Sequence, residues 1–206
     1  MVKTLKKSKD SYRHGSLKKA IIEASLQMIE KEGVDTLSIR EVAKKAGVTH
    51  QAPYRHFKNR EALLAALAQD GLEKLFSYLQ QSFRTEGAPS LNLVKLGQAY
   101  FSWGLKNPDH FRLMFGHSIP DFETSEELGL AAQKILDLVN FVVIQNQKAK
   151  LFRPGEPRSI SRQLWAAVHG TTLLFINQQF KPLLNDSRAG LELVKELLNN
   201  LAIGLK

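Results

Sequence analysis

The chain has 206 residues, 43% of them hydrophobic, and a formal net charge of +9 at pH 7. This length can bury a hydrophobic core as one large or two small domains. The absence of cysteine excludes disulfides and metal sites built on thiolates. No apolar segment follows the basic start, MVKTLKKSKDSYRHG, so no secretory signal is predicted and a cytoplasmic location is expected.

The positive charge is concentrated at the start of the chain. Residues 1–60 hold 14 Lys and Arg against 6 Asp and Glu, a net charge of +8, whereas residues 61–206 hold 15 against 14. A basic segment on an electrically balanced body is typical of nucleic-acid-binding proteins, although a solvated basic tail has the same composition. The sequence therefore predicts a DNA-binding domain over 1–60 and a second domain over 61–206.

Helical periodicity runs through the first domain, and no segment shows the alternation of a strand. Ser38 and Glu41 form a capping box at the start of a short helix, and Gly47 allows a tight turn after it. Thr49 and Asn59 are further helix caps. The predicted helices are 17–33, 38–46, 49–57 and 59–84.

Five more helices are predicted in the second domain, which makes about nine in an all-α fold. Prolines separate several of them, as in the break RPGEP at 153–157, and a loop is expected over 116–125. The uncharged run 163–180 contains several amides, so it is expected to be a buried helix of a soluble protein, not a membrane span. The five helices are 90–106, 108–115, 125–150, 159–180 and 186–203.

Residues 38–57 have the pattern of a helix-turn-helix, in which the second short helix reads DNA. Gln51 can pair with adenine, and His50 with guanine or phosphate. Tyr54, His56 and Arg60 suit phosphate contacts, although Tyr54 and His56 can equally pack within the domain. The candidate DNA-binding residues are Ser38, Lys44, Thr49, His50, Gln51, Tyr54, Arg55, His56 and Arg60.

The stretch 33–67 resembles the DNA-binding region of the TetR family of bacterial transcriptional regulators. The likeness is carried by Gly33, Ser38, Val42-Ala43, Ala46-Gly47-Val48-Thr49, Tyr54-Arg55-His56-Phe57, Arg60 and Leu63-Leu64. Gln51 and Pro53 depart from the family pattern, which leaves the DNA sequence that is read open. The resemblance implies a three-helix head followed by a helical ligand-binding and dimerisation domain.

The second domain resembles, over a shorter match, a TetR subgroup marked by a Trp-x-x-x-His-Gly motif, here Trp165 with His169 and Gly170. Its aromatic residues predict an apolar ligand cavity, although each can equally be ordinary core. The candidate ligand-binding residues are Phe101, Trp103, Met114, Phe115, Phe141, Trp165 and His169.

Each of the last two helices carries an apolar stripe that is expected to pack against a second copy of the chain as a four-helix bundle. The same stripes can instead fill the core of one subunit. The candidate interface residues are Leu164, Val168, Thr172, Phe175, Leu191, Val194, Leu198 and Leu201.

These features together predict a homodimeric transcriptional repressor that a small apolar ligand releases from a palindromic operator, with two heads about 34–36 Å apart on double-stranded DNA. The alternative is a ligand-independent or nonspecific, architectural DNA-binding protein. No nucleophile–base pair, phosphate-binding glycine loop or metal motif is visible, so neither enzyme activity nor a cofactor, metal or membrane partner is predicted.

Overall fold

A computed structural model describes residues 14–82, 87–116, 125–179 and 187–205. Over these ranges the chain is helical and without strands, which confirms the all-α prediction; the basic segment 1–13 and most of the loop expected at 116–125 lie outside them. The elements are α1 (His14–Glu32), η1 (Val34–Thr36), α2 (Ile39–Lys45), η2 (Pro53–Arg55), α3 (Arg60–Ser82), α4 (Pro89–Lys106), α5 (Pro108–Phe115), α6 (Glu126–Lys148), α7 (Pro157–Ile176) and α8 (Ser187–Gly204), where η marks a 3₁₀ turn.

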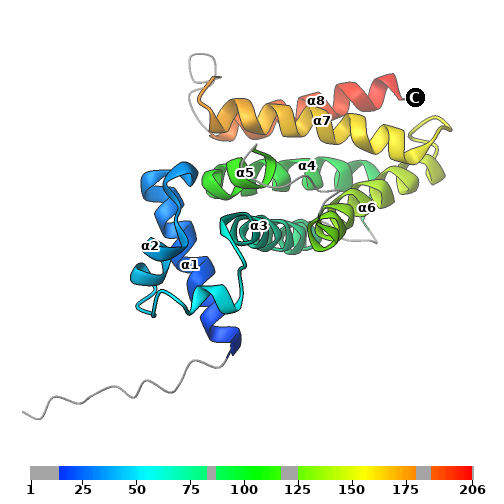
Figure 1. Cartoon of the computed structure of the whole chain (residues 1–206). Coiled ribbons are helices and arrows are strands. Elements are labelled where there is room, and N and C mark those ends of the chain that lie inside the picture. The colour runs from blue at the N-terminus through cyan, green and yellow to red at the C-terminus, as the bar shows by residue number, and fades with distance from the viewer. Residues whose placement is uncertain (1–13, 83–86, 117–124, 180–186, 206) are drawn as a thin grey trace, which may run out of the picture.

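The head, residues 14–59, is the small group of helices beside the larger bundle in Figure 1. In its core, the apolar side of each short element packs against the start of α3. Packing of this kind is needed because helices as short as α2 are not stable alone. The buried members include Ile21, Leu37, Val42, Phe57, Leu63 and Leu67.

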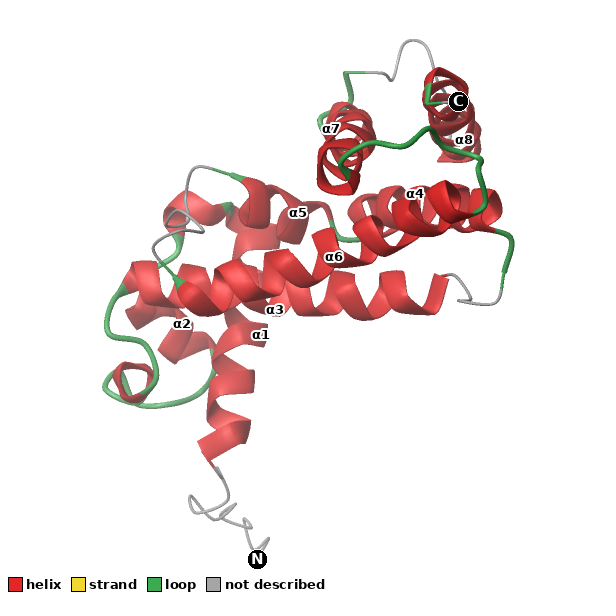
Figure 2. Cartoon of the chain, turned by 90° about the vertical axis from the view of Figure 1, so that its right-hand side faces the viewer, coloured by secondary structure: helices red, strands yellow, loops and turns green. Residues whose placement is uncertain are grey.

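The body, residues 60–205, is built around α4, which packs against α3, α6, α7 and α8. Figure 2 shows α7 and α8 side by side, covering α4. Two glycines of α4 allow this close approach, because a Cβ atom at Gly97 would meet Leu198 and one at Gly104 would meet Thr172. Within the described ranges, none of these helices has the length and apolar character that crossing a membrane requires.

The expected helix ends are largely confirmed. Ser38 caps α2, its hydroxyl oxygen accepting a hydrogen bond from the Glu41 backbone N–H at 3.2 Å. Asn59 Oδ1 accepts from the Ala62 backbone N–H at 2.9 Å and so caps α3. Gly33 stops α1 with φ of 86°, a value that favours glycine.

The helix predicted over 49–57 is wrong. The chain forms turns and then the 3₁₀ element η2, Pro53–Arg55. Pro53 has no N–H to donate to the carbonyl of Thr49, which accepts instead from Ala52 N at 3.0 Å in a tighter turn. The structure therefore has eight α-helices in its described residues, not about nine.

The head core and the body core share two helices. α3 contributes its first turns to the head and its later turns, including Leu72 and Leu75, to the body. α5 contributes Leu113, only 2% exposed, to the head core, while Phe111 and Met114 belong to the body core. Any movement of α3 or α5 is thus transmitted by packed side chains to both cores.

Candidate DNA-binding surface and ligand cavity

The segment 46–57 presents most of its polar side chains outward while Pro53 and Phe57 anchor it in the head. Thr49, His50 and Gln51 are exposed. Tyr54 is 51% exposed, and Arg55 beside it is also exposed. The structure therefore leaves the predicted base-reading residues accessible, although the segment is a turn and not a helix.

A surface hollow lies between α2 and this turn. It is lined on one side by Arg40, Glu41 and Lys44 and on the other by Val48, His50 and Tyr54. Of the predicted DNA-binding residues, Lys44, His50 and Tyr54 are thus brought together at one place. Lys44 Nζ lies 3.8 Å from a Glu41 oxygen with both groups exposed, a contact too weak to withhold the lysine from a phosphate.

Arg40 belongs to this hollow but was missed by the sequence analysis. It is exposed on α2 and lies four residues before Lys44, so one helix face carries both cations. The four-residue spacing of the two cations, on the side of α2 opposite the apolar Ile39, Val42 and Ala43, is the signal that the sequence offers. Two cations on the outer face of the first helix of a helix-turn-helix are suitably placed for the DNA backbone.

Arg60 has a different environment from the one expected. Its Nε donates to the carbonyl of Leu37 at 2.9 Å and its Nη2 to the carbonyl of Val34 at 2.7 Å. The guanidinium therefore links the start of α3 to η1 and to the residue after it. Of its three nitrogens, only Nη1 takes part in neither hydrogen bond. Its phosphate contact stays a prediction, but its first role is to hold the head together.

The other two candidates of the head are partly withdrawn from the surface. Ser38 uses its hydroxyl as the cap of α2. His56 is half-buried, with its ring centroid 6.2 Å from that of Phe57. The alternative in which the side chain packs within the domain thus applies to His56 but not to Tyr54, which is exposed. A DNA contact from either residue stays a prediction.

The body contains an aromatic cluster around His169. The imidazole stacks on Trp165 and on Phe111, with ring centroids 5.0 and 5.2 Å away, and meets Phe115 edge-on at 4.5 Å. His169 Nδ1 and the Tyr100 hydroxyl are hydrogen-bonded at 2.8 Å. Burial lowers the pKa of His169 to about 4, so this histidine is neutral at pH 7.

Two apolar hollows flank this cluster and share Trp165 as a wall. The inner cavity lies among α3, α4, α6, α7 and α8, includes Tyr100 and Val168 in its lining, and has a volume of only about 30 Å³. The outer groove, of about 270 Å³, is lined by Phe115, by Leu136 of α6 and by Trp165. Only the outer groove approaches the size of small-molecule sites.

The predicted ligand-binding residues divide into three groups. Phe115 and Trp165 line the hollows, and the His169 ring packs against both of these side chains. Phe101, Met114 and Trp103 are core side chains that line neither hollow, and Phe141 is exposed on α6; their expected ligand contact is not supported by their placement. Tyr100 was missed, because its partner His169 lies 69 residues away and no local spacing connects them.

Most of the predicted dimer residues pack within the subunit. Leu164, Val168, Thr172, Val194 and Leu198 are all buried within the subunit. Phe175, Leu191 and Leu201 are partly buried and pack on the same core. A side chain already covered by its own subunit has little surface left for a partner, so the five buried residues belong to the core, and an interface role for the three partly buried ones stays a prediction.

Comparison with known families supports both halves of the chain. A model described as "Bacterial regulatory proteins, tetR family" matches residues 21–67. A second, described as "Tetracyclin repressor-like, C-terminal domain", matches residues 93–198. The two matches cover the helix-turn-helix and most of the body.

Individual proteins also resemble this chain over most of its length. An uncharacterized HTH-type transcriptional regulator, YobS of Bacillus subtilis, is 28% identical over 173 residues, which cover 83% of this chain and 85% of YobS. A protein of unknown function from Rhodococcus sp. RHA1 has a similar structure, with a TM-score of 0.81, 30% identity and coverage of 96% and 99% of the two chains. The regulator FadR of Bacillus subtilis, solved with stearoyl-CoA, has a TM-score of 0.74 at 16% identity over 91% and 99%.

Proposed function

Because the chain belongs to the TetR family of bacterial transcriptional regulators, and is thus a DNA-binding regulator, we propose that it is a homodimeric repressor released from a palindromic operator by a small apolar ligand. DNA binding is assigned to 1–60, and ligand binding and dimerisation to 61–206. The observation that carries the proposal is the position of α5, which joins a wall of the ligand groove to the head core.

The coupling runs through two residues of one short helix. Phe115 lines the outer groove, and Leu113, two positions earlier, is packed in the head core. A ligand that displaces Phe115 shifts α5 and with it the head. The ligand acts only to the extent that it binds the displaced state more tightly than the DNA-binding state.

A dimer is required by the size of the head, because one helix-turn-helix contacts too few bases to specify a site. The interface we propose is the outward side of α7 and α8, beside the stripes that fill the core. Leu174 is 37% exposed and Ile203 is 63% exposed, and a Cβ atom at Gly170 would meet no neighbour. An exposed apolar helix pair of this kind is suited to isologous packing against its copy.

The interface is tested by Leu174→Glu, with Leu130→Glu as the matched control. Leu130 is 57% exposed and belongs to α6, not to the proposed interface helices, so both changes place a carboxylate at an exposed leucine. Sedimentation is expected to show a dimer for the parent and the control and a monomer for Leu174→Glu. A dimer that survives Leu174→Glu and Ile203→Glu together overturns this interface.

The operator is tested by footprinting on DNA at moderate salt. A discrete protected site with two-fold symmetry supports the repressor model. Uniform coverage of the duplex, with the same affinity for scrambled sequence, supports the nonspecific, architectural alternative instead, because binding to phosphates alone carries no sequence information.

A further inference from the structure

The outer groove continues into a polar pocket between α6 and α7. The two hollows share Gln133 and Leu136 of α6 as lining. Beyond these shared residues the polar pocket is lined by Asp137 and Asn140 of α6 and by Arg158, Ser161 and Arg162 of α7. An apolar groove therefore ends at a site that carries two guanidinium groups and one carboxylate.

Both arginines of this pocket are exposed to solvent. They are four residues apart on one side of α7, where like charges repel each other. Arg158 also lies in the first turn of α7, where the helix dipole disfavours a cation. The Glu156 carboxylate caps this helix by accepting hydrogen bonds from the backbone N–H groups of Arg158 and Ser159.

Neither guanidinium forms an ion pair with a carboxylate within the described parts of the chain. The nearest acid of the pocket, Asp137, accepts instead from Gln133 Nε2 at 2.7 Å. The Ser161 hydroxyl is likewise bonded within the protein, to the carbonyl of Pro157 at 2.8 Å. The two arginines thus remain the cationic donors that face this pocket.

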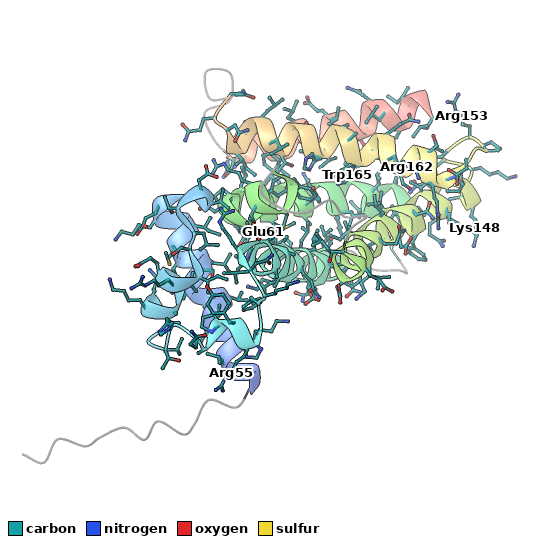
Figure 3. All side chains as sticks on the ribbon, viewed as in Figure 1. Arg55, Glu61, Lys148, Arg153, Arg162 and Trp165 are labelled. Atoms are coloured by element: carbon teal, nitrogen blue, oxygen red, sulfur yellow. The ribbon has the colours of Figure 1, made fainter. Side chains whose placement is uncertain are left out.

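From this juxtaposition we propose that the effector is an anionic amphiphile. Its carboxylate or phosphate head is held by Arg158 and Arg162, and its apolar chain extends past Leu136 along the outer groove to Trp165. Arginine suits such a head because its planar fork pairs with two oxygens at once. Figure 3 shows Arg162 and Trp165 along the same helix, as the head and tail of one ligand require.

This inference deepens the proposed function and rests on its ligand-controlled release, since it names the chemical class of the effector. It adds a requirement that a purely apolar cavity does not impose. A neutral molecule with the same tail fills the groove but leaves both guanidinium groups unpaired. The protein is thus expected to discriminate ligands by the charge of the head and not only by the length of the tail.

The test compares three probes of equal tail length by calorimetry on the full chain: decanoate, decyl phosphate and decanol, each below its micellar concentration. The expected result is that at least one anionic probe binds about tenfold or more tightly than decanol, and the two anions show whether carboxylate or phosphate is preferred. Equal binding of all three, tighter binding of decanol, or binding of none overturns the proposal.

The residues are tested with Arg158→Gln and Arg162→Gln, alone and together, and with Arg153→Gln as the matched control. Arg153 is exposed in the loop before α7, lies apart from Arg162 in Figure 3, and loses the same charge. The preference for the anion is expected to disappear in the double variant and to persist in the control. Unchanged decanol binding shows that each variant remains folded.

A further variant tests the sign of the charge at the pocket. Asp137→Asn removes the carboxylate and is expected to raise the affinity for the anionic probe several-fold without changing that for decanol. Should the double arginine variant fail to fold, the two single variants and Asp137→Asn decide the matter. An anion preference that none of these changes alters overturns the assignment.

Operator binding is measured separately on the same preparations. Anionic probes that bind through Arg158 and Arg162 but leave the DNA complex intact contradict ligand-controlled release and leave the binding site standing. Release of DNA by neutral apolar compounds alone supports the proposed function and overturns the anionic ligand. The two failures are therefore distinguishable.

Discussion

The head and the body are both helical, but they leave different kinds of surface uncovered. The head packs its apolar side chains into one core and turns polar side chains such as His50 and Gln51 outward. The body surrounds two hollows with apolar walls and places one neutral histidine, His169, beside them. The proposed function accordingly assigns DNA to the exposed polar groups of the head and a small molecule to the apolar hollows of the body.

The two regions are nevertheless one mechanical unit, because α3 and α5 belong to both cores. Removing a side chain at this junction is expected to have the largest effect of all single changes. Leu113→Ala should lower the free energy of unfolding by about 2–5 kcal/mol, the cost of a cavity at a fully packed site. Urea unfolding of this variant measures the loss.

The matched control is Leu130→Ala, at a leucine of the body that is 57% exposed. It should change the free energy of unfolding by less than about 0.5 kcal/mol. If Leu113→Ala were equally mild, the α5 contact with the head would not be tight enough to couple the two regions.

Arg55 of the head and Arg60 at the start of α3 are expected to affect DNA recognition and stability differently. Arg60→Ala removes the donors of two hydrogen bonds to the carbonyls of Val34 and Leu37, so the free energy of unfolding should fall by about 1–3 kcal/mol. Arg55→Ala, at an exposed position, should leave stability unchanged. Thermal unfolding of the two variants tests this difference.

DNA binding sharpens the same contrast. Arg55→Ala should weaken binding to all duplexes and reduce the slope of log affinity against log salt by about 1, as expected for one lost phosphate contact. A salt slope that stays at the parent value contradicts the placement of Arg55 on the DNA backbone.

A smaller effect is expected at the base-reading position. Gln51→Ala should reduce the discrimination between the preferred base pair and its substitutes by about 1–3 kcal/mol, and Tyr54→Ala should weaken all sequences alike. Binding to a set of singly substituted operator duplexes measures both. Unchanged sequence preference in Gln51→Ala shows that another side chain reads that base.

The pH dependence of stability tests whether His169 is buried in the body. Burial lowers the pKa of His169 to about 4, below its unfolded value of 6.5. Between these values the unfolded chain binds a proton that the folded chain does not, so stability falls as pH decreases from 6.5 towards 4. His169→Phe should flatten this part of the profile in denaturant titrations; a slope identical to the parent would show that His169 is not the source.

A carboxyl group contributes in a separate, more acidic range. Burial raises the pKa of Asp70, but hydrogen bonds from His110 and Lys74 outweigh it and hold the pKa below its usual 3.8. Stability from Asp70 is therefore lost only as pH falls through that lowered value. The two ranges allow His169 to be measured without interference from this group.

The sequence predicted the two regions unequally, for physical reasons. In the head, the cap at Ser38 and the stop at Gly33 are local signals and were read correctly. At Pro53 the missing N–H breaks the helical hydrogen-bond pattern, so a turn forms where the periodicity predicts a helix. The bonds of Arg60 to carbonyls more than 20 residues away have no signature in local spacing.

In the body, the long periodic segments predict the helices correctly, but they do not show which neighbour each helix face contacts. A stripe such as Val194 with Leu198 has the same spacing whether it contacts its own subunit or a partner. The same limit applies to the ligand residues, since Phe101 and Phe115 are equally aromatic and only one lines a hollow. Periodicity gives the amphipathic face of a helix, and tertiary packing alone decides its neighbour.

The measurement that tests the central account most directly is selection of bound duplexes from a random-sequence pool, with the mass of the selected complex determined in solution. The account predicts enrichment of an inverted repeat, and a complex that contains two chains or a multiple of two. Recovery of unrelated sequences at equal affinity, bound by single chains, would contradict a paired head controlled from the body.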